Sequence, residues 1–279
     1  MTLVDDLRWI RSETRRVRKV ARLRRAAGLA PFALTEARSR KQSDTLVVLG
    51  SGRSINRLTD ADWQRLDRDY DTLGLNFWML HPFTPRFYQF EAGPTDDRTR
   101  QLEDFLTERA ARMAHVMMIY KDMERNQLDL SRLPDTTVQS LRVLNKVNLP
   151  VTTEPRLERA LALVRSIGLT RATGLLLFAR ASIVQAATFG AEMGYKRIVL
   201  AGVDLNDTRY FWDEDPQLSW FSTAQPGTIH RTMDPTLAGV TVDRVLMIVR
   251  DQWLAPTGVE LFCGHASSAL HPRLPAFFG

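Results

Sequence analysis

The sequence has few of the features that mark secreted or membrane-spanning proteins. It holds one cysteine in 279 residues, Cys263, so an internal disulfide cannot form and we expect a reducing compartment. No stretch reaches the roughly 20 apolar residues that a membrane-spanning helix needs. The N-terminus also lacks the apolar segment of a secretory signal. These absences predict a cytoplasmic protein in which Cys263 is a buried packing residue.

Acidic residues are scarce at the start of the chain. Residues 1–42 hold 12 Lys or Arg against 4 Asp or Glu, a net charge of +8, which leaves −2 for the remaining 237 residues. We predict a helical extension over 1–42, in which apolar residues form only a thin stripe between the arginines. Three interpretations stay open: an interfacial helix on anionic lipid, an arm that binds nucleic acid, or a helix docked on its own body. Because the rest of the chain carries no nucleic-acid-binding signature, we expect no nucleic-acid partner.

The stretch 45–76 predicts a strand, a glycine turn, a helix and a second strand. Residues 45–49 are an apolar run typical of a buried parallel strand, and Gly50-Ser51-Gly52-Arg53-Ser54 follow directly. Thr59, with Asp62 three residues later, marks the start of the helix. The second strand ends at Asn76. Ligands bind beyond the carboxyl ends of strands in open α/β sheets, so we expect the active site at this edge, which we call the carboxyl-end rim.

Strands and helices alternate along the rest of the chain, which predicts one α/β domain with a mostly parallel sheet. Two segments interrupt the alternation. The segment 122–150 has no clear period, and we expect it to form structure on the acceptor side, because long loops in compact folds are often functional. The aromatic segment 205–239 fits no regular element, so we expect an ordered loop or lid over the rim. The further strands and helices are predicted at 86–91, 96–113, 115–120, 155–168, 173–178, 182–194, 197–204, 240–254 and 259–263.

The glycine turn fits neither of two common nucleotide-binding motifs. No Gly-Lys-Ser follows it, as a Walker A loop requires, and it lacks the third glycine of the dinucleotide fingerprint. Asn76 stands where a dinucleotide-binding protein has an acidic residue. These differences disfavour a nucleoside triphosphatase or a dehydrogenase. Backbone amides and hydroxyls remain, and they can hold a phosphate or a pyrimidine.

Further candidates follow later strands of the predicted sheet. Asp204 is either the cap of the next turn or, with Asp207, a metal ligand. His230 lies beside Arg231 in the aromatic segment, so it is either a general acid or base or a surface residue. We interpret His81 and His115 as structural residues. His265, Ser267 and Ser268 follow the last predicted strand, so we expect them to reach the rim.

Five short motifs give the chain a resemblance to a known family. They are Leu-Gly-Ser-Gly-Arg-Ser-Ile at 49–55, Gly-Leu-Asn at 74–76, Phe-Tyr-Gln at 87–89, Ala-Arg-Ala-Ser at 179–182, and Gly-Tyr-Lys-Arg-Ile-Val-Leu-Ala-Gly-Val-Asp at 194–204. In this order they resemble the bacterial sialyltransferases of glycosyltransferase family 42. The resemblance implies a single Rossmann-like (GT-A-like) domain over 43–279 that uses a CMP-activated sugar without a metal ion.

The resemblance also implies how the nucleotide is held. Asn76 matches an asparagine of the family's second strand, and Ser182 matches its nucleotide-binding serine. Ser51 and Gln89 stand where the family has asparagines, so a hydroxyl replaces an amide at Ser51, whereas Gln89 keeps the amide group. The predicted set for the nucleotide and sugar is Gly50, Ser51, Gly52, Ser54, Asn76, Gln89, Arg180, Ser182, Asp204, Arg231, Ser267 and Ser268.

Two residues are predicted to be catalytic through the same resemblance. Tyr210 is the counterpart of the family tyrosine that follows Gly-x-Asp, and His230 is the counterpart of the general-base histidine. An inverting transfer needs a base that takes the proton of the acceptor hydroxyl. The departing CMP phosphate needs hydroxyls and amides, and the sugar carboxylate needs a cation such as Arg180 or Arg231.

The sequence therefore predicts a transferase that moves sialic acid or the related keto sugar Kdo from a CMP-sugar to a glycan or lipid-linked acceptor, with no cofactor and no metal. Its N-terminal helix would hold it at the anionic inner face of a membrane. A homo-oligomer is an open alternative. Hydroxymethylpterin pyrophosphokinases of the archaeal type resemble the chain as well, which would imply ATP, Mg²⁺ and a metal role for Asp204 and Asp207. A non-catalytic glycan-assembly protein is a third alternative.

Overall fold

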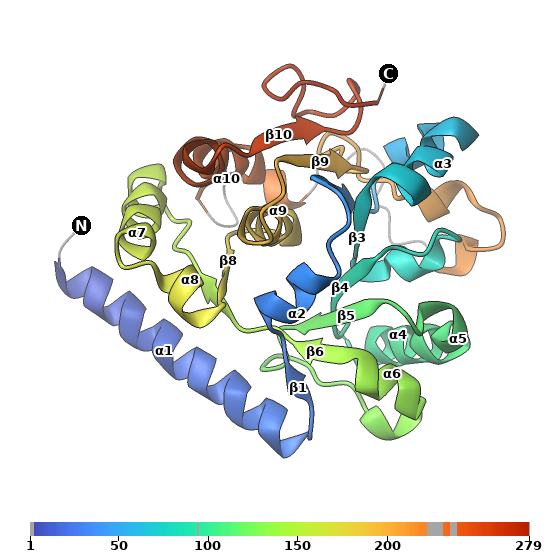
Figure 1. Cartoon of the computed structure of the whole chain (residues 1–279), viewed down its shortest axis with the longest axis horizontal. Coiled ribbons are helices and arrows are strands. Elements are labelled where there is room, and N and C mark those ends of the chain that lie inside the picture. Colours follow the sequence, from blue (N-terminus) through green and yellow to red (C-terminus); the bar gives the residue numbers. More distant parts are fainter. Residues whose placement is uncertain (1–2, 94, 222–230, 235–238, 279) are drawn as a thin grey trace.

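An eight-stranded parallel sheet forms the centre of the protein (Figure 1). The structure is a computed structural model that describes residues 3–93, 95–221, 231–234 and 239–278. The strand order is β1-β6-β5-β4-β3-β2-β9-β10. The strands are β1 (Ala30–Pro31), β2 (Thr45–Leu49), β3 (Asp71–Leu75), β4 (Phe87–Glu91), β5 (Met117–Lys121), β6 (Leu141–Val143), β9 (Arg197–Ala201) and β10 (Glu260–Cys263).

The order of the strands places a topological switch point between β2 and β9. From β2 the chain builds outward through β3, β4, β5 and β6, and it then returns to add β9 and β10 on the other side of β2. In open parallel sheets the crevice at the switch point, beyond the carboxyl ends of the strands, is the usual place for a ligand. The predicted carboxyl-end rim is therefore formed as the sequence indicates.

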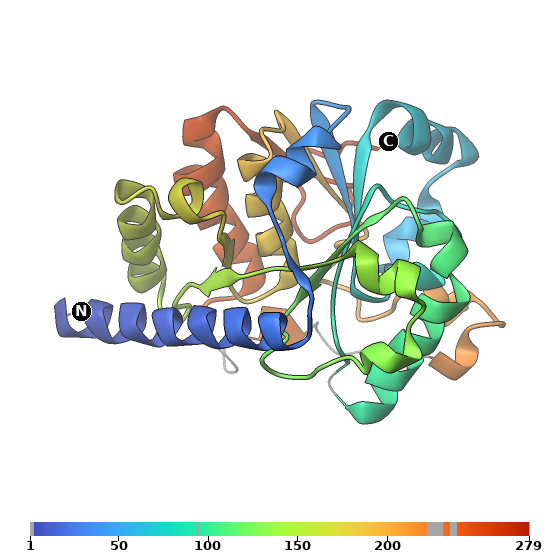
Figure 2. The ribbon, with the colours of Figure 1, turned by 60° about the horizontal axis from the view of Figure 1, so that its bottom comes forward.

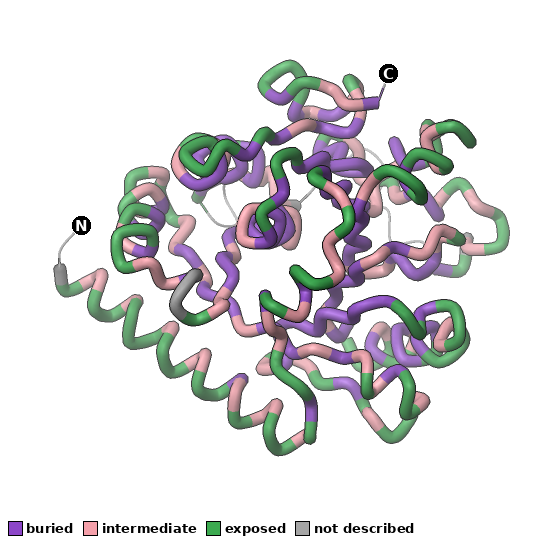
Figure 3. Tube along the Cα trace, in the orientation of Figure 1, coloured by how far each residue is buried: buried purple, intermediate pink, exposed green. Residues whose placement is uncertain are grey.

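Helices cover both faces of the sheet. One face packs under α2 (Leu34–Ser39), α7 (Glu154–Ser166), α9 (Ser182–Glu192) and α10 (Val242–Val249). The other face packs under α3 (Asp60–Asp69), α4 (Asp96–Glu108) and α5 (Ala110–Met113). The central strands are buried on both sides, which Figure 3 shows as buried residues along the middle of the molecule. This two-sided burial explains why the strands are apolar runs without alternation.

The predicted strand–turn–helix–strand unit is confirmed. Every residue of β2 is buried, and α3 begins after Thr59, whose hydroxyl accepts a hydrogen bond from the backbone N–H of Asp62. The Asp62 carboxylate accepts from the backbone N–H of Thr59 in return, at 2.9 Å. This reciprocal cap satisfies two donors of the first helical turn and fixes where the helix starts.

A small second sheet and a short helix occupy the region where the sequence predicts one longer strand. β7 (Lys146–Asn148) pairs in parallel with β8 (Leu176–Phe178), while α8 (Leu169–Thr173) lies just before β8. Gly168 and Gly174 bracket α8, both with positive φ. The prediction of a strand over 173–178 is therefore right only for its last three residues, because the helix ends at a left-handed glycine.

The segment 122–150 is built into the body through short regular elements that the sequence did not predict. It contributes a turn η3 (Leu130–Arg132), the helix α6 (Asp135–Ser140) and the strands β6 and β7. β6 lies inside the main sheet, where it pairs with β5 and β1. Its three residues are too few to show a period, and this brevity hid them from pattern analysis.

The N-terminal helix α1 (Leu3–Ala26) lies along the outside of the molecule, beside α7 and α8 (Figures 1 and 2). The Trp9 indole N–H donates to the carbonyl of Asn148, and Arg16 pairs with Glu124 at 3.0 Å. After α1 the chain forms β1 at the edge of the main sheet and α2 in the core, so the second half of 1–42 belongs to the body. None of the described helices is both long and apolar enough to cross a membrane.

Candidate functional site

Strained backbone residues mark the carboxyl ends of the strands. In the described part of the chain, four residues other than glycine have positive φ, and each follows a strand. They are Asn76 (φ 53°) after β3, Asp122 (φ 58°) after β5, Arg180 (φ 63°) after β8 and Leu205 (φ 65°) after β9. Such residues cost energy, persist only where the surroundings hold them, and cluster at functional sites. This pattern favours the carboxyl-end rim as the site.

The glycine loop after β2 runs against the chain that follows β9. The backbone N–H of Gly50 donates to the carbonyl of Ala201, and that of Gly52 donates to the carbonyl of Gly202, both at 2.8 Å. A Cβ at Gly50 would lie 2.6 Å from the Gly202 oxygen, and one at Gly52 would lie 2.6 Å from Oδ2 of Asp204. Glycine is therefore required at both positions by close approach.

Asp204 holds the glycine loop in place. Its Oδ2 accepts a hydrogen bond from the backbone N–H of Ser54 at 2.9 Å, at the start of the short helix η1 (Arg53–Arg57). Both side chains are buried, and Oδ1 of Asp204 has no hydrogen-bond partner among the described residues. Asp204 thus caps a turn 150 residues away, whereas the sequence suggested a cap of its own next turn or a metal ligand.

The aromatic segment starts directly beside the glycine loop. Gly52 and Tyr210 form an antiparallel bridge, and the backbone N–H of Phe211 donates to the carbonyl of Ser51 at 3.0 Å. Tyr210 stacks on Trp212 with ring centres 4.5 Å apart. Two residues that the sequence assigns to the site, Ser51 and Tyr210, are therefore neighbours in space.

Aromatic contacts fasten this segment to the body. Phe211 meets the Trp78 ring at 5.5 Å and His81 at 5.2 Å, and Phe221 meets Phe77 at 4.8 Å. His81 is stacked within 4.6 Å of two tryptophans, and burial together with two nearby arginines lowers its pKa to about 4. The interpretation of His81 as structural agrees with this packing, and the rings explain how residues 211–221 pack on the body without a regular period.

Three amide side chains, at the end of β3, in β4 and in α9, each have a buried polar atom without a hydrogen-bond partner among the described residues. The Gln89 amide N–H donates to Oε1 of Gln185 at 3.2 Å, and both side chains are fully buried. Over the described ranges, Oδ1 of Asn76, Oε1 of Gln89 and Nε2 of Gln185 have no hydrogen-bond partner. Buried polar atoms are rarely left unpaired, so these atoms are candidates for contact with a ligand. Gln185 was not among the predicted residues, although it lies in the same first turn of α9 as Ser182.

Arg180 connects the start of α9 with the segment after His230. Its guanidinium donates to the carbonyl of Thr232 at 3.0 Å and to the carbonyl of Asp234. Arg231 begins the short helix η6 (Arg231–Met233). His230 lies outside the described residues, so its predicted role as a base remains a prediction.

The serines after β10 hold the C-terminal loop against β9. The hydroxyl of Ser268 donates to the carbonyl of Val203 at 2.6 Å, and the hydroxyl of Ser267 lies 2.8 Å from Nδ1 of His265. The amide of Asn206 donates to the Ser267 carbonyl at 3.0 Å. These contacts place both serines at the rim and give them a structural task there.

A buried cluster of charges at the rim was missed by sequence reasoning. Lys121 pairs with Glu91 at 2.8 Å, and Lys146 pairs with Asp122 and lies 3.7 Å from the centre of the Phe178 ring. Burial lowers the pKa of Lys146 to about 8, even though Asp122 acts against it. Burial opposes the charge of Asp122 too, but Lys146 and the other neighbours outweigh it and lower its pKa to about 2. Lys121 and Asp122 directly follow an apolar run, which is the signal that could have found them.

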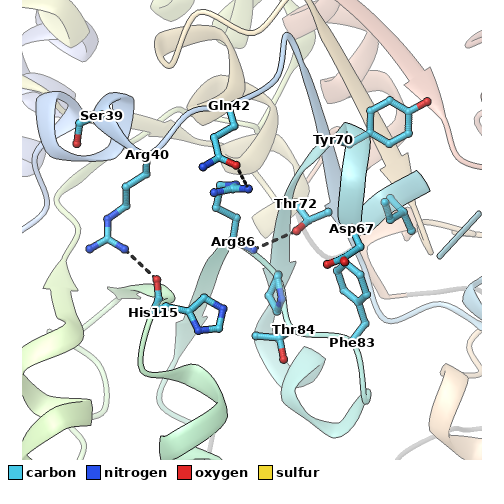
Figure 4. Close-up of a pocket in the computed structure, with 12 residues that line it drawn as sticks. Ser39, Arg40, Gln42, Asp67, Tyr70, Thr72, Phe83, Thr84, Arg86 and His115 are labelled. Carbon is cyan, nitrogen blue, oxygen red and sulfur yellow. Dashed lines mark hydrogen bonds between the residues drawn. The ribbon is translucent and has the colours of Figure 1, made fainter. Parts of the chain in front are cut away.

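A polar pocket of about 350 Å³ lies at the opposite edge of the sheet, at the amino ends of β3 and β4 (Figure 4). Its arginines are engaged by neighbouring groups. Arg86 pairs with Asp71 at 2.7 Å, and Arg40 donates to the carbonyl of His115 at 3.0 Å. None of the predicted site residues whose side chains the structure describes lines this pocket.

Acidic residues near the rim are held by protein groups. Asp207 pairs with Arg209 at 2.7 Å, and this contact lowers the pKa of Asp207 to about 2. Within the described ranges, no three His, Cys, Asp or Glu side chains are arranged to hold a metal ion.

The sheet, its switch point and the glycine loop together define a Rossmann-like α/β protein with its candidate site at the carboxyl-end rim. No family model and no curated protein matches the chain. The fold is similar to the sialyltransferase CstII from Campylobacter jejuni in complex with cytidine-5'-monophosphate, at 12% identity and a TM-score of 0.46 over 83% of this chain and 84% of that chain. It is also similar to the alpha-2,3-sialyltransferase Cst-I from Campylobacter jejuni, at 12% identity and a TM-score of 0.48 over 84% of this chain and 80% of that one.

Proposed function

We propose that this protein is a glycosyltransferase that moves sialic acid or Kdo from a CMP-sugar to a glycan or lipid-linked acceptor without a metal ion. The observation that carries the proposal is the concentration of strained residues at one rim, Asn76 and Arg180 among them, beside a glycine loop that pairs with Tyr210. The motifs shared with glycosyltransferase family 42 fall on these same elements. The CMP-sugar donor is inferred from those motifs, and the residues of the rim are the groups that would bind it.

The leaving CMP phosphate requires hydrogen-bond donors at the rim. The N–H of Ser54 already serves Asp204, so the start of η1 is occupied by a protein carboxylate. The start of α9 has no side-chain cap, and Ser182 lies in its first turn. A helix N-terminus attracts anions, so we expect the phosphate at α9 with the Tyr210 hydroxyl as a further donor.

The pyrimidine would bind at the buried amides. Cytosine presents a donor amine and two acceptors along one edge, which match the oxygen of Asn76 or Gln89 and the nitrogen of Gln185. Each of these atoms is buried without a partner within the described chain.

The base that we propose is His230. Arg180 holds the carbonyls of Thr232 and Asp234, two and four residues after His230. A neutral imidazole there would take the proton of the acceptor hydroxyl as it attacks the donor sugar. The charge of Arg180 or Arg231 would face the sugar carboxylate.

The proposal includes a peripheral contact of 1–42 with an anionic membrane. One side of α1 docks on the body, where Asp6 pairs with Arg159 and Arg16 pairs with Glu124. The other side is exposed and carries arginines that form no ion pair within the described part of the chain: Arg8, Arg11, Arg15, Arg18 and Arg22. A basic helix face of this kind is attracted to anionic lipid. The protein would then work in the cytoplasm at the inner membrane face.

The test is the release of CMP from purified protein incubated with CMP-sialic acid or CMP-Kdo in EDTA. We expect release by the wild type and a loss of about a hundredfold or more in His230→Ala, with CMP binding retained. His115→Ala is the matched control, because His115 is an exposed histidine at the opposite edge of the sheet. Absence of release with both donors contradicts the proposed reaction, and full activity of His230→Ala removes that residue from it.

A further inference from the structure

An apolar cavity of about 270 Å³ lies between α1 and the α7–α8 unit. Trp9 and Val17 of α1 form one wall, and Leu163, Leu169 and Leu175 form the other. The helix that we propose to meet the membrane therefore has a hollow on its body side. A hollow lined by apolar side chains favours an apolar occupant, because water gains few hydrogen bonds there.

Exposed apolar side chains lie on α1 and at the end of α7, two of the elements that line this cavity. Five large hydrophobic residues are exposed in the described chain, and four of them are Val4, Leu7 and Ile10 on α1 and Ile167 at the end of α7. Ile10 and Ile167 line the cavity itself, with 40% and 58% of their surfaces exposed. Such a concentration of exposed apolar surface marks a contact with a partner or a membrane.

The charge at the cavity selects an anionic occupant. Glu13 also lines the cavity, but its carboxylate pairs with Arg16 at 3.0 Å and accepts from the backbone N–H of Asn148 at 2.7 Å. Arg18 lines the cavity too, and it is exposed without an ion pair among the described residues. The charged group that remains available to a ligand at this cavity is therefore the positive guanidinium of Arg18.

We propose that this cavity binds an acyl chain of an anionic phospholipid, with the lipid phosphate at Arg18. The inference rests on the proposed membrane contact of 1–42 and names the lipid that α1 engages. An anionic headgroup pairs with the arginines of the exposed face, while the chain fills the hollow beneath it. A second copy of this chain is a poor occupant, because the same face would bring Arg11, Arg15 and Arg18 against their own counterparts.

Trp9 reports directly on the cavity. Its indole lines the hollow, so bromine atoms on a lipid chain that enters the hollow would quench its fluorescence. Vesicles of brominated phosphatidylglycerol are the probe, and brominated phosphatidylcholine is the neutral control. The difference between the wild type and Trp9→Phe isolates Trp9 from the other tryptophans. We expect the anionic vesicles to remove about half of the Trp9 emission and the neutral vesicles to remove little.

Three variants separate chain insertion from surface attraction. Val17→Phe and Leu175→Phe fill the cavity from opposite walls and keep every charge, so vesicle binding should survive while quenching of Trp9 is lost. Arg18→Gln should lower the affinity for anionic vesicles about fivefold, whereas Arg68→Gln, on the exposed part of α3, should not change it. Circular dichroism checks that each variant is folded. If one of the two cavity-filling variants does not fold, the other still tests the proposal.

The outcomes decide the proposal independently of the transferase reaction. Binding to anionic vesicles without quenching of Trp9 would overturn the acyl-chain site and leave only a surface contact. Equal quenching in the cavity-filling variants would overturn it as well. A dimer in the absence of lipid that Ile10→Ser dissociates would show that a second copy covers this face. CMP release measured without vesicles does not depend on any of these results.

Discussion

The carboxylate of Asp204 accepts a hydrogen bond from the backbone N–H of Ser54 at 2.9 Å, and thereby joins the end of β9 to the loop after β2. These two strands flank the switch point of the sheet. The contact fixes the glycine loop against which Tyr210 is paired. One buried carboxylate therefore sets the geometry of the rim on which the proposed donor site depends.

Removing this carboxylate should loosen the rim. Asp204→Ala leaves the buried N–H of Ser54 without its acceptor, which costs about 1–3 kcal/mol in the free energy of unfolding. CMP affinity should fall as well, because the glycine loop loses its tie to β9. Asp204→Asn is the matched control, since an amide oxygen can still accept the bond. Urea unfolding and CMP titration measure both effects, and an unchanged Asp204→Ala protein would count against this role.

Stability should fall in mild acid because of His81. The pKa of His81 is about 4 in the folded protein, through burial and then the charges of Arg112 and Arg109, against an ordinary value near 6.5. Between these values the unfolded chain binds more protons, so the free energy of unfolding decreases as the pH falls from 6.5 to 4. The contribution of this one group reaches about 3 kcal/mol.

The measurement for His81 is urea unfolding at pH 7 and pH 4.5. His81→Phe keeps an aromatic ring between Trp63 and Trp78 and cannot titrate, so its stability should depend less on pH. The backbone N–H of Phe83 donates to Nδ1 of His81 at 3.0 Å, so the variant gives up some stability at pH 7. If the free energy of unfolding depends equally on pH in the two proteins, groups other than His81 cause the loss of stability in acid.

The buried pair of Lys146 and Asp122 should matter more than an exposed pair. Lys146→Met leaves the buried Asp122 carboxylate with its longer ion pair to Lys121, at 3.8 Å, which costs about 3 kcal/mol. The control is Lys196→Met, because Lys196 pairs with Asp44 at the surface and is 75% exposed, so its loss costs less than about 1 kcal/mol. Thermal unfolding compares the two variants. Similar losses of stability in the two variants would mean that burial does not make the Lys146–Asp122 pair more important than an exposed pair.

Local signals were enough to predict the part of the fold that carries the rim. An apolar run ending in Gly50 and Gly52, a cap at Thr59 and a second short run identify β2, α3 and β3, because each feature is encoded within a few residues. The aromatic residues of the segment 205–239 indicate packing for a similar reason, and Phe211, Trp212 and Phe221 are buried in the structure.

The remaining features depend on contacts between distant segments. Asp204 acts on Ser54, 150 residues earlier, and Lys146 meets Asp122 only because β7 begins near the end of β5. β1 has two residues and is a strand only through its pairing with β6. Gln185 carries no signal in sequence, since a glutamine inside a helix is usually solvated and becomes notable only when found buried against Gln89.

Thermal stability in the presence of nucleotides tests the central claim most directly. The purified protein is melted with CMP, UDP, GDP or ATP, each in EDTA and in Mg²⁺. A ligand that binds only the folded state at about 100 times its dissociation constant adds roughly 2.7 kcal/mol, which a melting curve resolves. The account predicts stabilisation by CMP in EDTA that Mg²⁺ does not increase. Stabilisation by ATP with Mg²⁺ alone would point to a pyrophosphokinase, and no shift with CMP would contradict a CMP-sugar transferase.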